Sequence, residues 1–245
     1  MTSSNVTKRP TAKEVAGLLR NIDIEAVKKI FSPQHIGAIY LPDIVAPPLL
    51  FELQKDVAHL QKTGRFTIAR RRESDGTEQN FSYFYIEAGK NPFSELDNLN
   101  GMRKLAAVHI DTIYNPIAEW SGNFKPVEMP NSIAVNQYPA REGFIGYHRD
   151  YPYNRNMIMA ISVDGISQFS VALNKKGDGK LCYILTPGSG VLMRAPFDSV
   201  AGEGEEALRP LHTVKTLEGK RKAILLRNIN EEMMFAQDKK STGAN

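Results

Sequence analysis

The spacing of apolar residues is helical in the first half of the chain and strand-like in the second. The clearest helical stripe consists of Leu49, Leu53, Val57 and Leu60. It follows Pro47, a residue type that suits the first turn of a helix. We therefore expect a helix that begins at Pro47 and carries the whole stripe on its buried face.

Other local signals predict further helices before residue 130. Thr11 and Glu14 have the spacing of a capping box, and Asp23 can cap a second short helix. Residues 102–115 are typical of a longer helix. Pro116 should end or kink that helix, because proline lacks an N–H donor and its ring clashes with the preceding turn.

Strand-like segments follow a different pattern. A strand is expected over 35–41, and two β-prone arms flank Asp75-Gly76, so we expect a hairpin within 65–89. From Asn131 onward, short apolar runs alternate with Pro, Gly, Asn and Asp, which favours an antiparallel sandwich or barrel. The runs are SIAVNQY, FIGYH, MIMAISV, QFSVAL, LCYIL, GVLMR and KAILLRN.

This order of elements predicts an α+β fold in which the helices pack on the outside of one β core. Nothing resembling a linker separates the helical part from the β part, so we do not expect a separate helical domain. The expected organisation is a flexible N-terminus (1–10), helices and a hairpin (11–130), the β core (131–230) and a flexible tail (231–245).

The composition is that of a globular protein. Of 245 residues, 42% are hydrophobic and 24% are charged, and the chain is long enough to bury a large core. The one cysteine, Cys182, excludes an internal disulfide and any cysteine-based metal cluster. A net charge of +4 permits an anionic partner without requiring one. The chain lacks a membrane-spanning or secretory apolar segment, so we expect a cytoplasmic protein without membrane contact.

One histidine–carboxylate pair stands out as candidate metal chemistry. His148 and Asp150 lie two residues apart at the end of an expected strand, so their side chains can share one face. His212 begins another expected strand. Two histidines and one carboxylate form the facial triad of non-heme Fe(II) oxygenases, which leaves coordination positions open. The other histidines are expected to be packing or surface residues: His35, His59 and His109.

Two arginines on the last expected strand suggest an anion site. Arg221 and Arg227 are six residues apart, and the residues that share their face, Ala223 and Leu225, are apolar. Guanidinium groups bind carboxylates in a bidentate manner, so a dicarboxylate such as 2-oxoglutarate would suit the pair. The alternative is that both arginines lie at the surface with their charged ends in water.

Taken with Asn136 and Tyr138 ahead of His148, these residues resemble the Fe(II)/2-oxoglutarate-dependent dioxygenases, and more narrowly their AlkB-like branch. The resemblance covers roughly residues 36–228 and rests on five motifs in the right order. It implies a double-stranded β-helix, or jelly roll, of the cupin-like kind, with Fe(II) at one end. It also implies 2-oxoglutarate as co-substrate and O₂ as oxidant.

The resemblance assigns a role to each matching residue. It implies that the triad holds iron and that Arg221 takes the distal carboxylate of 2-oxoglutarate. Arg227, with Asn136 and Tyr138, would lie near the 1-carboxylate and keto end. Because Asp150 keeps its carboxylate, the resemblance implies a hydroxylase rather than a halogenase, with release of succinate and CO₂.

The substrate has two competing interpretations. A small organic metabolite is one, and Tyr151 and Tyr153 could line the mouth of its site. The other is an AlkB-like oxidative N-demethylase of nucleic-acid bases, with contacts from three consecutive arginines and the aromatic run 81–85. The arginines are Arg70, Arg71 and Arg72.

We favour the metabolite because the segment before His212 is long and acidic. Residues 202–206 contain three glutamates, which would repel phosphate, and Leu211 stands where the AlkB-like branch has an aromatic. The hairpin around Asp75-Gly76 and the segment 202–206 are the expected lids. A non-catalytic cupin-like metal-binding module would not need the arginine pair. The sequence leaves the oligomeric state open.

Overall fold

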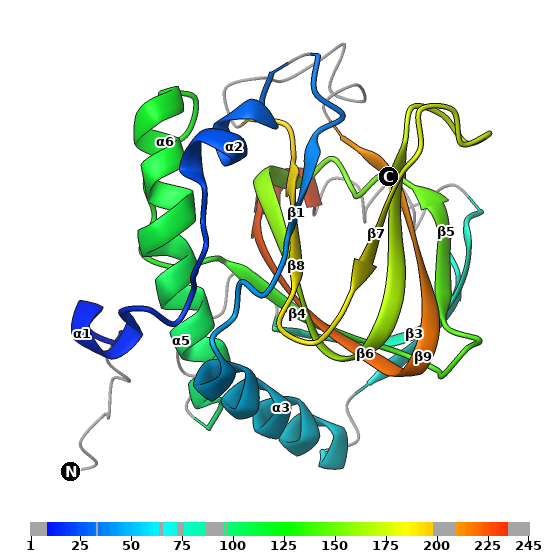
Figure 1. Cartoon of the computed structure of the whole chain (residues 1–245), viewed down its shortest axis with the longest axis horizontal. Coiled ribbons are helices and arrows are strands. Elements are labelled where there is room, and N and C mark those ends of the chain that lie inside the picture. The colour runs from blue at the N-terminus through cyan, green and yellow to red at the C-terminus, as the bar shows by residue number, and fades with distance from the viewer. Residues whose placement is uncertain are drawn as a thin grey trace.

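The protein is a bent β-sheet structure with its helices gathered on one side (Figure 1). The computed structural model describes residues 9–32, 34–63, 66–72, 76–86, 96, 98–197 and 209–234. The helices are α1 (Ala12–Val15), α2 (Ile24–Lys29), α3 (Pro47–Lys62), α5 (Asn100–His109), the π-helix η1 (Ile110–Tyr114) and α6 (Asn115–Ser121).

The strands form one antiparallel system in the order β1-β8-β6-β9-β4-β3-β2. In addition, β5 pairs with β3 and β9, and β7 pairs with β6. This pairing curls the sheet into a jelly roll and confirms the expected α+β fold class with external helices. The strands are β1 (Ala38–Leu41), β2 (Thr67–Arg71), β3 (Glu78–Ile86), β4 (Ser132–Tyr138), β5 (Phe144–His148), β6 (Asn154–Ala172), β7 (Leu181–Leu185), β8 (Gly190–Arg194) and β9 (Leu211–Ile229).

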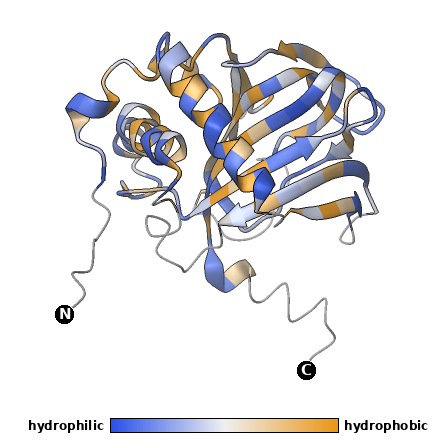
Figure 2. Cartoon of the chain, turned by 90° about the horizontal axis from the view of Figure 1, so that it is seen from below, coloured by the Kyte–Doolittle hydropathy of each residue, from blue (hydrophilic) through white to orange (hydrophobic). Residues whose placement is uncertain are grey.

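Alternation along the central strands creates two separate cores. On β6, Met157, Met159 and Ile161 pack against the helices, whereas Ile158 between them faces the interior of the jelly roll. The stripe of α3, including Leu53, belongs to the first core. Figure 2 shows hydrophobic and hydrophilic residues along the helices and strands. The helices therefore brace the outside of the sheet and leave its interior for a site.

The expected helix over 102–115 is longer than predicted and contains a π turn. Pro116 does not break it, because η1 widens the helix just before the proline and lets it enter the first turn of α6. The Asn115 N–H donates to the Ile110 carbonyl, five residues earlier. The π turn thus relieves the clash between the Pro116 ring and the preceding turn, which had led us to expect the helix to end or kink there.

Two strands are also longer than the apolar runs suggest. The runs MIMAISV and QFSVAL join into β6, and β9 carries both His212 and the arginine pair. Asp164-Gly165 looks like a turn, but Gly165 adopts φ +70 and the chain bends without leaving the sheet. The pairing of β6 with β9 is irregular between Ser162 and Ser167. The two longest strands therefore run through both halves of the jelly roll.

Several smaller expectations can be compared directly. The capping box at Thr11 and the cap at Asp23 are confirmed. The strand expected over 35–41 begins only at Ala38, because Gly37 adopts φ +85 and lies against Arg194.

The two arms of the expected hairpin, β2 and β3, pair as predicted. Its turn at 73–75 and the acidic segment 202–206 lie outside the described residues. At the ends of the chain, Arg9 forms an ion pair with Asp111, and residues 231–234 form a helical turn. The rest of the two expected flexible ends lies outside the described residues. No helix in the described part of the chain combines the length and hydropathy needed to cross a bilayer.

Burial of His109 predicts a measurable acid sensitivity. Burial lowers the pKa of His109 from 6.5 to about 3. Between these values the unfolded chain binds one proton more than the folded chain, so stability falls as the pH falls. His109→Phe should reduce the slope of unfolding free energy against pH by about 1.4 kcal/mol per pH unit. Urea unfolding of the metal-free protein measures that slope; equal slopes for parent and variant would contradict the assignment.

Candidate active site

A cavity of about 520 Å³ opens inside the jelly roll, on the face of the sheet opposite the helices. This volume lies within the range of small-molecule sites. Residues from β2, β3, β4, β5, β6, β8 and β9 line it, together with the loop that follows β5. The expected triad and both expected arginines lie in this one cavity.

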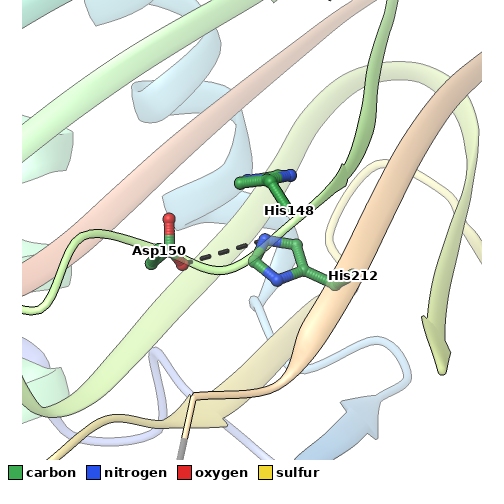
Figure 3. Close-up of side chains that lie close together, drawn as sticks. All are labelled: His148, Asp150 and His212. Atoms are coloured by element: carbon green, nitrogen blue, oxygen red, sulfur yellow. Dashed lines mark ion pairs between the residues drawn. The ribbon is translucent and has the colours of Figure 1, made fainter. Parts of the chain in front are cut away.

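The side chains of the triad line this cavity and lie close together (Figure 3). His148 ends β5, Asp150 follows in the loop, and His212 is the register partner of His148 on β9. The His212 Nε2 atom lies 3.8 Å from Asp150 Oδ2, and the potential ligand atoms of all three residues lie within 4.8 Å of one another. The three residues could therefore hold one metal ion.

Both imidazoles are oriented for metal binding by hydrogen bonds at the far nitrogen. His148 Nδ1 lies 2.8 Å from the Gly146 carbonyl, and His212 Nδ1 lies 3.0 Å from the Pro210 carbonyl. A carbonyl only accepts, so each Nδ1 carries the proton and each Nε2 keeps its lone pair. Burial lowers the pKa of His148 to about 3, so this imidazole is neutral, as a metal ligand must be.

The carboxylate of Asp150 is held in its ionised form. Burial alone would raise its pKa, but the two histidines, and after them Arg227 and Arg72, outweigh burial and lower it. Two arginines also form hydrogen bonds with the backbone of this loop. Arg72 donates to the Arg149 carbonyl at 2.6 Å, and Arg209 donates to the Asp150 carbonyl at 2.8 Å. The position of the carboxylate is therefore tied to both β2 and the segment before β9.

The distal end of the cavity holds a buried guanidinium. Arg221 is 3% exposed and is the register partner of Tyr138, whose ring lies 4.7 Å from the guanidinium carbon. Burial lowers the pKa of Arg221, and Tyr138 partly offsets that effect. Asn136 donates to the Tyr138 hydroxyl at 3.4 Å. Arg221 Nε and Asn136 Oδ1 have no hydrogen-bond partner among the described residues, so polar atoms in this part of the cavity are left for a ligand.

Arg227 lies at the metal end. Burial alone would lower its pKa, but interactions with Tyr85, Asp150 and Tyr153 outweigh burial and raise it. Its guanidinium carbon lies 5.5 Å from the centre of the Tyr85 ring. The structure thus groups the residues differently from the resemblance, because Tyr138 lies against Arg221 rather than with Arg227.

A change of alternation along β9 lets one strand serve both ends of the cavity. Cavity-facing side chains are even-numbered at His212 and Val214 but odd-numbered at Arg221 and Arg227. The change falls where β6 and β9 pair irregularly and where Gly219 adopts φ +65. Without it, a regular strand would point His212 and Arg221 to opposite faces, because they are nine residues apart.

The residues present suit Fe(II) and 2-oxoglutarate. Two neutral imidazoles and one carboxylate are a ligand set that Fe(II) accepts, and they leave coordination positions free. A buried arginine with an unpartnered Nε atom suits a carboxylate, because an unpaired buried cation is costly. The ends of a dicarboxylate could therefore be held by the metal and by Arg221.

The expected substrate residues occupy different environments. Tyr151 and Tyr153 line the cavity and stack on each other, with ring centres 4.9 Å apart. Arg70 and Arg71 are exposed at the rim, whereas Arg72 is buried with its guanidinium 3.9 Å above the Tyr151 ring. Arg72 thus supports the loop of the metal ligands, so a triple alanine variant of the arginine run would not test the rim alone.

Sequence reasoning gave too little weight to the aromatic face of β3. Phe81, Tyr83 and Tyr85 alternate along the strand and all line the cavity. Phe81 stacks on Tyr138 with ring centres 5.2 Å apart. The period of two was visible in the sequence, but the same pattern fits an aromatic face turned into an ordinary core.

Comparisons with known proteins identify the fold. No family model and no curated protein matches the sequence. Among solved structures, a Trichoplax adhaerens prolyl hydroxylase bound to a hypoxia inducible factor peptide fragment has a TM-score of 0.57 and 14% identity, covering 85% of this chain and 91% of that one. The non-heme alpha ketoglutarate dependent carbocyclase SnoK from nogalamycin biosynthesis has a TM-score of 0.54 and 10% sequence identity, and the match covers 85% of each chain. OsALKBH1 has a TM-score of 0.51 and 13% sequence identity, and the match covers 78% of this chain and 98% of that one. The chain shares their fold.

Proposed function

We propose that this protein is an Fe(II)- and 2-oxoglutarate-dependent dioxygenase that hydroxylates a C–H bond of a small organic molecule. The observation that carries the proposal is the juxtaposition, in one cavity, of the triad His148, Asp150 and His212 with the buried Arg221. The shared fold of solved 2-oxoglutarate oxygenases supports it. A purely metal-binding cupin-like module has no need for a buried arginine at the far end of the cavity.

Each group of residues has a defined task in this reaction. When bound, Fe(II) and 2-oxoglutarate supply the chemistry that reduces O₂, with loss of CO₂ and formation of succinate. His148, Asp150 and His212 would hold the metal on one face and keep the others open. Arg221 with Tyr138 would orient the co-substrate through its distal carboxylate. The apolar lining around them, such as Phe169 and Val214, keeps this end of the cavity poor in water.

The finer assignment to the AlkB-like branch is also part of this proposal. It rests on the Asn136-x-Tyr138 pair and on the six-residue spacing of Arg221 and Arg227. Oxidative demethylation of a nucleic-acid base is the second candidate function. The arginines at the rim, Arg70 and Arg71, and the aromatic face of β3 favour it. We prefer the small molecule because the cavity is of small-molecule size.

Succinate release tests the proposal. The protein supplied with Fe(II), 2-oxoglutarate and O₂ should form succinate, and one class of primary substrate should stimulate the rate at least about tenfold. The panel combines organic metabolites, methylated oligonucleotides and a proline-containing peptide. Stimulation by metabolites supports the small-molecule assignment, and stimulation by oligonucleotides supports demethylation. Absence of succinate, together with absence of 2-oxoglutarate binding to the Fe(II)-loaded protein, would refute the proposal.

A further inference from the structure

We infer that the mouth of the cavity binds a small molecule that carries a planar ring next to an oxyanion group. This inference rests on the proposed function, because it concerns the substrate of the same site. The two parts of the substrate correspond to two features of the mouth: a pair of cationic side chains on β2, and a wall of tyrosines from β3 and the loop after β5.

Among the described residues inside the cavity, no acidic group is left to balance the rim arginines when the co-substrate is bound. The metal ion, Arg72, Arg221 and Arg227 would together carry five positive charges. Asp150 and 2-oxoglutarate would together carry three negative ones. The inner cavity is then already positive. Asp150 is the only acid among the described residues that line the cavity. Nothing in the inner site therefore neutralises a further cation at the mouth, and an anionic substrate is favoured.

Two consecutive arginines of β2, Arg70 and Arg71, line the mouth of the cavity. They belong to the run 68–72, every residue of which contributes to the lining, and the pairing of β2 with β3 shifts register between Ala69 and Arg71. Arg70 donates to the Asn80 side chain, which uses one of the five N–H donors of a guanidinium. Arg71 has a loose ion pair with Glu78, with the charged atoms 3.9 Å apart. Both guanidinium groups keep donors for an oxyanion.

The tyrosine wall supplies flat surfaces at the same mouth. Tyr151 and Tyr153 are stacked with an interplanar angle of 9°, and Tyr83 and Tyr85 have ring centres 4.8 Å apart. All four rings line the cavity and none is fully buried, so faces and edges remain available to a ligand. Burial raises the pKa of Tyr83 and of Tyr153, so their hydroxyl groups stay neutral donors. Aromatic walls bind planar groups by offset stacking and edge contacts.

Matched probes test the oxyanion and the ring separately. The probes are indole-3-acetate, indole-3-acetamide, cyclohexaneacetate, phenyl phosphate and a single-stranded oligonucleotide. Isothermal titration calorimetry would measure their binding to the anaerobic complex of the protein with Fe(II) and 2-oxoglutarate. We expect indole-3-acetate to bind at least about tenfold more tightly than the amide and than the cyclohexane acid. Tight binding of phenyl phosphate would also support the inference and would identify phosphate as the oxyanion.

Variants at the rim show where the oxyanion lies. Arg70→Gln combined with Arg71→Gln should weaken binding of indole-3-acetate at least about tenfold and leave the weaker binding of the amide unchanged. Arg20→Gln is the matched control, because Arg20 is exposed and lies outside the cavity lining. It should leave all affinities unchanged.

Three results would overturn the inference. The first is equal binding of indole-3-acetate and indole-3-acetamide. The second is unchanged binding of indole-3-acetate in the double variant. The third is binding of the oligonucleotide but not of the small oxyanions. If the complex with 2-oxoglutarate forms and one of these results is found, only the inference fails. If that complex does not form, the proposed function fails with it.

Discussion

Replacing His148 with alanine should remove metal binding from the cavity and with it all substrate-dependent turnover. The imidazole is neutral and buried, and its Nε2 faces Asp150 and His212. Loss of one of three protein ligands should weaken metal affinity by at least about 100-fold, because losing a mere supporting contact already costs about 10–100-fold. Calorimetric titration with Mn(II) measures the affinity. Circular dichroism checks that the fold is kept.

Two further variants make this result specific. His59→Ala changes an exposed histidine on α3 and should leave metal affinity unchanged. Asp150→Gly removes the carboxylate and leaves a coordination position where a halide could bind, so hydroxylation should be lost. A variant at Asp150 that hydroxylates at the parent rate would show that this carboxylate is not a ligand.

Replacing Arg221 with alanine should raise the dissociation constant for 2-oxoglutarate on the order of 100-fold or more. The change leaves a buried carboxylate without its cationic partner, and breaking such a pair costs about 3–5 kcal/mol. Tyr138→Phe should cost only about 1 kcal/mol, because one hydrogen bond is lost while the ring stays in place. Titration of 2-oxoglutarate into the metal-loaded protein measures both constants.

Arg221→Lys separates charge from geometry in the same experiment. Lysine keeps the positive charge but not the forked donors, so its affinity should fall between those of the parent and of Arg221→Ala. If Arg221→Ala and Tyr138→Phe both bind 2-oxoglutarate as tightly as the parent does, the co-substrate assignment is wrong even where metal binding persists.

Two members of the triad could be located from sequence because their geometry is local, whereas the position of His212 beside them depends on the register between β5 and β9. His148 and Asp150 lie at the end of one strand, and a spacing of two residues is informative there. The grouping of Tyr138 with Arg221 could not be located in the same way. It depends on the register between β4 and β9, two strands separated by more than 70 residues of chain. The burial of Arg72 is likewise a tertiary effect, since a run of three arginines favours an exposed position.

The fold class was easier to predict from the sequence than the residues at which its helices and strands end. The apolar runs after Asn131 fall on strands because their alternation matches a two-sided sheet. The rule for Pro116 predicted an interruption, and so did the separation of the apolar runs MIMAISV and QFSVAL. A π turn and a bulge absorb both irregularities without ending the helix or the strand. Such adjustments depend on packing against neighbouring elements, which a single sequence does not display.

The change of alternation on β9 makes the active site a composite of two separable modules. Under the proposed function, His212, before the irregular stretch, would form part of a metal module, and Arg221 and Arg227, after it, would form a co-substrate module. One residue inserted or deleted near Gly219 would rotate the second module outward while leaving the first in place. The product would be a jelly roll that still holds a metal ion but no longer orients a dicarboxylate. A single indel could therefore separate an oxygenase from a simple metal-binding protein of the same fold.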